Sequence, residues 1–487
     1  MKDESKEQAK EFYKKALALE KEEKYKEAIE YYDKAIELQP NNTNYLNMRG
    51  IVKIDVEDYE GAIKDFTKCI ELKPKHRIAY NNRGLAKSHL EEYEEAIKDY
   101  DICIASLPKA DYAYYNRGLA KYELGEYEDA IKDYDKCIEL KPKNVDYYYS
   151  RGEAKYKLGD CEGAIKDFDK CIELKPKYPY YYNMRGIVKS ELKEYEEAIK
   201  DYNKCIELDA KYEGYYNRGL VKNDLEEYEE AIKDFDKAIE LNPFDNYAYN
   251  FRGIVKNELK DYQGAIEDFD KSIELNSFYP NPYYNRGNTK RNLQNYSEAL
   301  KDYDKAVELD NNYIDVYNEI GITKIRLANI QLKNNNILEA KKLLNEAIIY
   351  FNKCIELDSN YAESYDGIGF VNTKFANIER NNGNISKAIE IYNECLKYFY
   401  KTLELDNEHA YALNSIGYIK NILANIQKES IPENEYKKLK SESLENFKNA
   451  YKIADNELKE KIKKYLIKLA KENNDVGIKF CRNNNLI

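Results

Sequence analysis

The sequence predicts an all-α protein built as an α-solenoid of about twelve antiparallel helix-turn-helix repeats, closed by a C-terminal capping helix. Three observations predict it. The dipeptide Arg-Gly recurs eight times at a spacing of 33 or 34 residues. Amphipathic stretches of helical period flank each copy, and the 487 residues include only 20 glycines and 10 prolines. A period of this length is typical of repeat proteins, whose units pack mainly on their neighbours.

The first repeat, 9–42, is expected to form an N-terminal unit over 1–42. Ala16 and Ala28 are its pair of small residues, one on each helix and equally far from the interhelix bend. The repeat has no Arg-Gly dipeptide, as terminal repeats often depart from the consensus.

Eight repeats of about 34 residues follow at 43–313, and the copy at 111–144 is representative. Each of its two predicted helices carries one apolar stripe. Gly118 and Ala130 are expected to face each other across the pair and allow the helices to approach closely. Pro142 prevents the second helix from continuing.

The period then lengthens to 48 residues in three repeats at 314–457, in which Gly321, Gly369 and Gly417 take the place of Gly118. Turn-rich sequences lie midway through these repeats, so each helix is expected to have gained about seven residues, nearly two turns. The remaining segment, 458–487, is expected to form a single capping helix with a frayed end.

This pattern resembles the tetratricopeptide repeat family. The family's conserved-type positions correspond here to Tyr114, Gly118, Ala130, Tyr134, Cys137 and Pro142. The sequence departs from the family at Arg117 and Lys121, where leucine and tyrosine are usual. The resemblance implies a right-handed superhelix whose first helices line a concave groove. It also implies a non-enzymatic scaffold that binds an extended peptide or partner segment there.

The resemblance implies that the second, fifth, sixth, ninth, twelfth and thirteenth places of each repeat face the groove. Asparagine recurs at two of these places. The fifth or sixth place holds Asn47, Asn82, Asn116, Asn183, Asn217, Asn250 and Asn285. A side-chain amide has a donor beside an acceptor and can pair with both groups of a peptide backbone. The series is therefore interpreted as a peptide-binding ladder, and the alternative is that these side chains are simply solvated.

Tyrosines and acidic residues occupy other groove-facing places. The tyrosines are Tyr112, Tyr115, Tyr149, Tyr216 and Tyr284. They are expected either to contact a bound peptide or to pack against the next repeat. The thirteenth place holds Glu123, Glu191, Asp224 and Glu258. An acidic wall favours a neutral or basic partner over an acidic one.

A covariation inside the sequence predicts a scaffold salt bridge. The eight repeats with arginine at the seventh place are the same eight with aspartate at the twenty-third place. Pairing within each repeat leaves no residue unmatched at either end of the series. Arg117 and Asp133 are therefore expected to bridge the two helices of their repeat. The alternative is that both are solvated and were copied with the repeat.

Composition and motifs exclude several classes of function. The formal net charge is −12 and no lysine or arginine block occurs, which disfavours nucleic acid and anionic membranes as partners. No signal peptide and no membrane-length apolar run is visible, so a cytoplasmic location is expected. The nine cysteines mostly repeat at one place that also accepts alanine or serine, which indicates small buried residues, not a metal site or disulfides.

No catalytic motif, phosphate loop or cofactor site is visible. The sequence is therefore interpreted as a non-enzymatic scaffold. The alternatives are a self-associating structural solenoid and a regulatory subunit of an enzyme complex.

Overall fold

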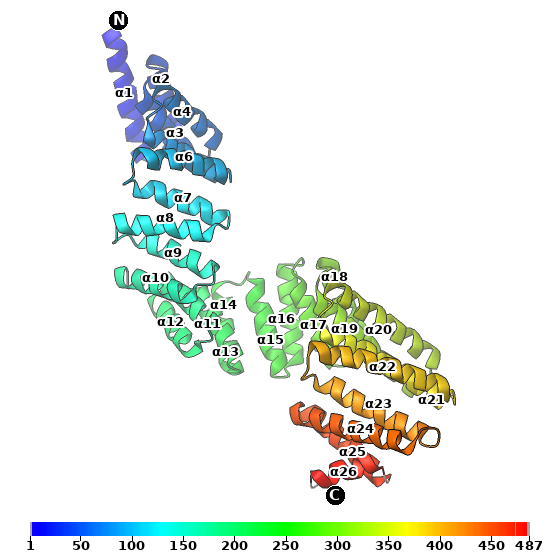
Figure 1. Cartoon of the computed structure of the whole chain (residues 1–487). Coiled ribbons are helices and arrows are strands. Elements are labelled where there is room, and N and C mark those ends of the chain that lie inside the picture. Colours follow the sequence, from blue (N-terminus) through cyan, green and yellow to red (C-terminus); the bar gives the residue numbers. More distant parts are fainter. Residues whose placement is uncertain (1, 210, 473, 485–487) are drawn as a thin grey trace. The chain divides into compact units, whose positions relative to one another are not determined.

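A computed structural model describes residues 2–209, 211–472 and 474–484, and within these residues every regular element is a helix. The all-α, solenoid-type fold is thereby confirmed. Contacts divide the chain into two compact units, Met1–Asn242 and Pro243–Ile487. In each unit, antiparallel helix pairs stack side by side, as α7, α8 and α9 do in Figure 1.

The first unit contains the first repeat and six repeats of about 34 residues. Its helices are α1 (Lys2–Lys21), α2 (Tyr25–Leu38), α3 (Thr43–Asp55), α4 (Tyr59–Leu72), α5 (Arg77–His89), α6 (Tyr93–Ser106), α7 (Asp111–Glu123), α8 (Tyr127–Leu140), α9 (Val145–Lys157), α10 (Cys161–Leu174), α11 (Pro179–Glu191), α12 (Tyr195–Leu208), α13 (Tyr212–Asp224) and α14 (Tyr228–Leu241).

The second unit contains two further short repeats, the three extended repeats and the C-terminal segment. Its helices are α15 (Asn246–Glu258), α16 (Tyr262–Leu275), α17 (Pro280–Asn292), α18 (Tyr296–Leu309), α19 (Ile314–Lys333), α20 (Ile337–Leu357), α21 (Ala362–Asn381), α22 (Ile385–Leu405), α23 (Ala410–Gln427), α24 (Glu433–Ile453), α25 (Asn456–Lys471) and α26 (Asp475–Asn483).

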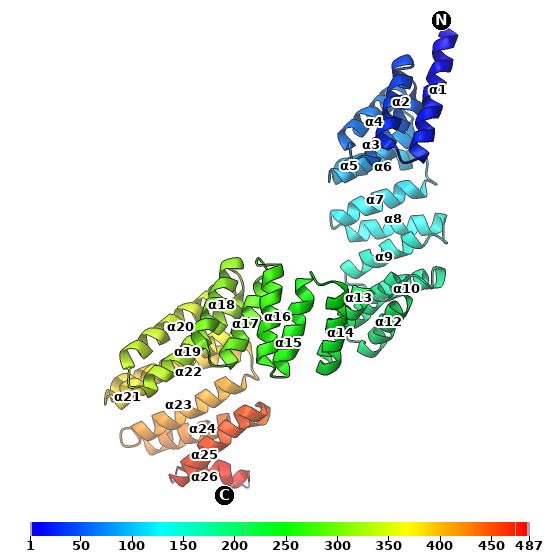
Figure 2. The ribbon, with the colours of Figure 1, turned by 180° about the vertical axis from the view of Figure 1, so that it is seen from behind.

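The extended repeats lengthen both of their helices, as expected. α19 has 20 residues and α20 has 21, against 13 and 14 in α17 and α18. Figure 2 shows α20 beside α19 from behind. Equal growth preserves the register, because a Cβ at Gly321 would still lie 2.7 Å from the ring of Phe351 on the second helix.

The C-terminal segment forms two helices, so the expectation of one capping helix was wrong. The Asn474 side chain accepts a hydrogen bond from the backbone N–H of Val476 at 3.0 Å and thereby starts α26. A Cβ at Gly477 would lie 2.5 Å from the backbone nitrogen of Ala470, so α26 packs directly on the backbone of α25. The frayed end expected at 485–487 lies outside the described residues.

The core of each repeat is a ring from the second helix packed on a glycine of the first. A Cβ at Gly118 would lie 2.7 Å from Cε1 of Tyr134, a fully buried ring. The nearest neighbour of Gly118 is thus Tyr134, not Ala130, because the long ring one turn later reaches the glycine. Ala130 is buried beside it in the same cluster.

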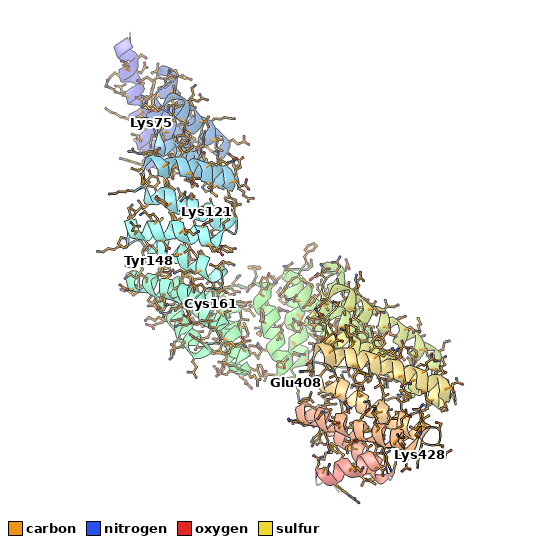
Figure 3. All side chains as sticks on the ribbon, viewed as in Figure 1. Lys75, Lys121, Tyr148, Cys161, Glu408 and Lys428 are labelled. Atoms are coloured by element: carbon orange, nitrogen blue, oxygen red, sulfur yellow. The ribbon has the colours of Figure 1, made fainter. Side chains whose placement is uncertain are left out.

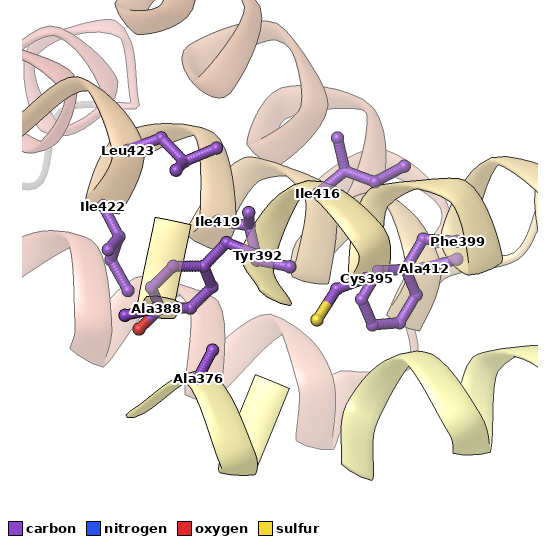
Figure 4. Close-up of a cluster of buried hydrophobic side chains, with 10 residues drawn as sticks. All are labelled: Ala376, Ala388, Tyr392, Cys395, Phe399, Ala412, Ile416, Ile419, Ile422 and Leu423. Carbon is purple, nitrogen blue, oxygen red and sulfur yellow. The ribbon is translucent and has the colours of Figure 1, made fainter. Parts of the chain in front are cut away.

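The extended repeats have the same type of core. Tyr392, Cys395 and Phe399 of α22 lie with Ile416 and Ile419 of α23 in one buried cluster (Figure 4). Consecutive repeats therefore share their apolar core, as nearest-neighbour stacking requires.

The turn inside each short repeat contains a left-handed residue at the fifteenth place. Lys193 has φ = 60° there, whereas Gly125 has φ = 78° at the same place with open space around its Cβ direction. A side chain in the left-handed region costs roughly 1–2 kcal/mol, partly offset by the greater freedom of glycine in the unfolded chain. Lys193→Gly should therefore stabilise its repeat by about 0.5–1 kcal/mol.

The reverse change, Gly125→Lys, should destabilise its own repeat by a similar amount. Hydrogen exchange in α7, α8, α11 and α12 of the full chain measures both effects. If the two substitutions changed the stability of their repeats in the same direction, backbone conformation would not set the stability of these turns.

Candidate functional site

Salt bridges join the two helices of each short repeat at the seventh and twenty-third places. Arg117 Nε donates to Asp133 Oδ2 at 2.9 Å, and the Lys121 ammonium donates to the same oxygen at 2.8 Å. Asp133 is 3% exposed. The expected Arg117–Asp133 pairing is therefore present. The matching Nε–Oδ2 distances of the other seven arginines are 2.9 or 3.0 Å.

The same arginines also link successive repeats. Arg117 Nη1 donates to Asp101 Oδ1 of the preceding repeat at 2.5 Å, and its guanidinium lies 5.5 Å from the ring centre of Tyr114. Figure 3 shows Lys121 on α7 and Tyr148, which stacks in the same way on Arg151, on α9. These arginines belong to the interfaces between helices, so they are not free to recognise a ligand.

The asparagine series forms hydrogen-bonded pairs between consecutive first helices. The sixth-place amide of one repeat donates to the fifth-place carbonyl of the repeat before it. The donor and acceptor pairs are Asn82 to Asn47 at 3.3 Å, Asn116 to Asn81 at 3.2 Å, Asn217 to Asn183 at 2.9 Å and Asn285 to Asn250 at 3.0 Å. The two places therefore vary together, since each of these fifth-place asparagines is followed by a sixth-place asparagine.

The pairs divide the series into two groups. The acceptors Asn47, Asn183 and Asn250 are at most 8% exposed, so they hold the neighbouring amides in place and offer almost no surface to a ligand. The donors, which are Asn82, Asn116, Asn217 and Asn285, are only partly buried. An amide nitrogen has two hydrogens, and the pairing uses one of them.

Four of the five selected tyrosines pack against other aromatic rings. Tyr115, Tyr149, Tyr216 and Tyr284 all occupy the fifth place and are partly buried. The ring centre of Tyr115 lies 5.2 Å from that of Tyr147, and Tyr284 lies 5.2 Å from Tyr313. The ring centre of Tyr149 lies 5.7 Å from that of Tyr180 in the next repeat, whereas Tyr216 lies 5.4 Å from Tyr212 of its own helix α13. Tyr112, in the second place, has 37% of its surface exposed.

The acidic residues of the thirteenth place lie at the surface. Glu123, Glu191, Asp224 and Glu258 are all exposed near the C-terminal ends of their first helices. Their carboxylates therefore add negative charge along the first helices of both units.

The repeated cysteines are small buried residues of the core. Cys137 is fully buried, and its thiol donates to the backbone carbonyl of Asp111 at 3.3 Å. Burial raises the pKa of this thiol to about 12, which disfavours the reactive thiolate. Ser272 makes the equivalent hydrogen bond to the carbonyl of Asn246 at 2.8 Å.

A pocket of about 400 Å³ lies on the first helices of the extended repeats. Its lining includes Asn318 and Arg326 of α19, Asp366 and Phe370 of α21, and Tyr411 of α23. These residues hold the fifth, thirteenth, fifth, ninth and second places of their repeats. The family resemblance assigns these places to the groove, but the sequence-based expectation covered only the short repeats. Extending the same places by the 48-residue period would have selected these residues as candidates.

Two other features of the described chain bear on ligand classes. Among residues 2–209, 211–472 and 474–484, no group of three or more His, Cys, Asp or Glu side chains could hold a metal ion. Nor does any helix within these ranges combine the length and apolar character that a membrane crossing requires.

Comparison with protein families finds the tetratricopeptide repeat along most of the chain. Models described as tetratricopeptide repeat match 9–42, 43–76, 78–106, 145–178, 179–212, 212–245, 247–279, 280–313 and 336–361. A model described as TPR repeat matches 118–159. A comparison with curated protein sequences finds no match.

Solved structures of the same type are similar over parts of the chain. YrrB, a TPR protein with an unusual peptide-binding site, is 26% identical over 37% of this chain and 92% of its own, with a TM-score of 0.33. A tetratricopeptide repeat protein from Parabacteroides merdae is 22% identical over 51% and 99%, with a TM-score of 0.41. Yeast Tom70 is 17% identical over 92% of both chains, with a TM-score of 0.39.

Proposed function

The chain belongs to the tetratricopeptide repeat family, a scaffold fold typical of protein–protein interaction, and from this premise we propose that its first helices bind an extended segment of a partner protein. The paired asparagines carry this proposal. Each pair holds a partly buried amide at the sixth place of a first helix: Asn82 and Asn116 in two consecutive repeats, Asn217 further along the first unit, and Asn285 in the second unit.

The pairing pre-organises the amides for a peptide. Asn116 donates one hydrogen to Asn81, so the amide plane is held before any ligand arrives. The second N–H and the carbonyl of Asn116 are then the groups offered to a peptide backbone. Ordering side chains in advance lowers the entropic cost of binding. An extended backbone suits such a series because it repeats the same donor and acceptor along its length.

The charge of the first helices favours a neutral or basic segment. Exposed carboxylates such as Glu123 and Glu191 repel an acidic segment and attract a basic one. Association should therefore slow as salt rises. The seventh-place arginines do not offset this charge locally, because each one is paired with the aspartate at the twenty-third place of its own repeat, as Arg117 is with Asp133.

A matched pair of triple variants tests the ladder. Asn116→Ala/Asn217→Ala/Asn285→Ala removes the three donors, and Asn81→Ala/Asn183→Ala/Asn250→Ala removes their buried partners. Both break the same three inter-repeat hydrogen bonds, so both should destabilise the chain. Only the first removes amides that could contact a peptide, at about 0.5–1.5 kcal/mol of binding for each.

The measurement is retention of a pool of capped random peptides by the immobilised full chain, read by mass spectrometry. The donor variant should retain much less than the partner variant. Equal retention by the two variants would show that the donor asparagines do not contribute to peptide binding. Absence of retention by the wild type at any salt concentration would contradict the proposed function itself.

A further inference from the structure

The pocket on the extended repeats marks the place where the asparagine pairing is broken. Asn318 holds the fifth place of its repeat, like Asn81 and Asn250, but the sixth place of the next repeat is Gly367. No amide is present there to donate to Asn318. Its Oδ1 is inaccessible to solvent and receives no hydrogen bond from any residue in the described ranges, and the whole side chain is only 8% exposed.

A second unpaired acceptor lies one repeat further along. Asp366 takes the fifth place of α21 and lines the same pocket as Asn318. Its Oδ1 is also inaccessible to solvent and has no hydrogen-bond partner in the described part of the chain. Leaving a buried acceptor unpaired is costly, and for a charged group the cost is greater.

His409 approaches this carboxylate but does not satisfy it. Its Nδ1 lies 4.0 Å from Asp366 Oδ1. The same nitrogen accepts a hydrogen bond at 3.2 Å from the backbone N–H of Ala412 and so caps α23. Because Nδ1 accepts, the ring proton is on Nε2, and His409 has no hydrogen at Nδ1 to give to Asp366.

The other charges around the pocket also leave Asp366 unpaired. Arg326 of α19 and Glu363 of α21 line the pocket, and the Lys374 ammonium lies 4.8 Å from the ring centre of Phe370. Within the described residues, no lysine or arginine nitrogen lies within 4.0 Å of the Asp366 carboxylate. Burial raises the pKa of Asp366 to about 6, against a smaller lowering by His409 and with a further contribution from Glu363, as expected for a carboxylate without a paired lysine or arginine.

We propose that this pocket binds an arginine side chain of the partner segment, which supplies the donors that Asn318 and Asp366 lack. A guanidinium is planar and carries five N–H donors, so one group can serve acceptors on two neighbouring helices. Ile322 and Phe370 offer apolar surface to its methylene groups. The inference rests on the proposed function and specifies one anchor residue of the bound segment.

The test compares pools of capped peptides that differ only at one fixed central residue. The central residue is arginine, lysine, glutamate or citrulline, which has nearly the shape of arginine but no charge. The full chain should retain the arginine pool over the citrulline pool by about tenfold or more, since hydrogen bonds to charged groups are worth roughly 1.5–3 kcal/mol. Lysine, a point charge, should fall between them.

Asp366→Asn is the diagnostic variant, because it keeps the shape of the side chain and removes the charge. It should abolish the preference for arginine without lowering thermal stability. Glu356→Gln, which removes an exposed acid from the second helix α20 of the same unit, is the matched control and should keep the preference. Asn318→Ala should weaken the preference and guards against an indirect effect of the Asp366 variant.

The outcomes separate this inference from the proposed function. If the wild type retains all four pools equally, the proposed function stands and the arginine site is wrong. If it retains none, the proposed function fails as well. Free argininamide that binds in an Asp366-dependent manner, without any preference among the peptide pools, would assign the pocket to a small cation and overturn the peptide anchor.

Discussion

Replacing Asp133 by alanine should destabilise the α7–α8 repeat by about 3–5 kcal/mol, the cost of removing one partner of a buried ion pair. Asp133 is 3% exposed and accepts hydrogen bonds from both Arg117 and Lys121. Its loss leaves two partly buried cations with one counter-charge, Asp101, on the neighbouring repeat. Burial alone would lower the pKa of Arg117, but the hydrogen bonds to Asp133 and Asp101 outweigh it and raise the pKa.

Hydrogen exchange in the full chain gives the local measurement, because unfolding of a long repeat array is not one all-or-none step. Amides of α7 and α8 should exchange much faster in Asp133→Ala, while those of α3 and α4 should change little. The matched control is Asp129→Ala, which removes an exposed carboxylate from the same helix α8. Equal effects of the two variants would show that the bridge adds nothing beyond a surface ion pair.

Replacing Asp366 by asparagine should have the opposite sign and stabilise the chain at neutral pH. The pKa of Asp366 rises from 3.8 to about 6, so the folded state favours the protonated acid. The contribution of Asp366 to wild-type stability should therefore fall as the pH rises from about 4 to about 6 and remain lower above that. A shift of this size corresponds to roughly 3 kcal/mol, which the asparagine variant should recover at pH 7.

The test is the difference in stability between the two proteins, since carboxylates away from the pocket titrate alike in both. At about pH 4 the wild type and Asp366→Asn should unfold at nearly the same temperature, and the gap should open toward pH 7. Exchange in α21 and α23 should show the same trend. A constant gap at every pH would mean that Asp366 ionises normally in the folded protein. A gain in stability together with a loss of arginine binding would identify the carboxylate as a functional group kept at a cost in stability.

Features that depend on the repeat period could be predicted from the residues. The spacing from Gly321 to Gly369 is longer than the spacing from Gly287 to Gly321. The equal lengthening of α19 and α20 follows from this change. The Arg117–Asp133 bridge followed from residues that appear and disappear together along the chain. Each feature depends on residues of a single helix pair. A sequence that contains many copies of that pair therefore reveals it without any coordinates.

The second partners of these residues were missed. Asp101 and Tyr114 share Arg117 with Asp133, and the sequence search looked for one partner for each charge. The division of the C-terminal segment into α25 and α26 was also missed, because the turn at Asn474 depends on a local cap and on the close contact of Gly477 with α25.

The sequence by itself determined the helix pairs, the two repeat lengths, the glycine positions and the bridges inside each repeat, because these depend on residues at constant separations along one unit. Only the tertiary structure decided which asparagines are buried acceptors and which are donors, because that depends on how one first helix lies against the next. It also decided that Asn318, Gly367 and Asp366 form one pocket. Because position 367 is a glycine, it has no side chain that could donate to the acceptors beside it. This matters only where three helices meet, so neither the period nor the composition could reveal that those acceptors are unpaired.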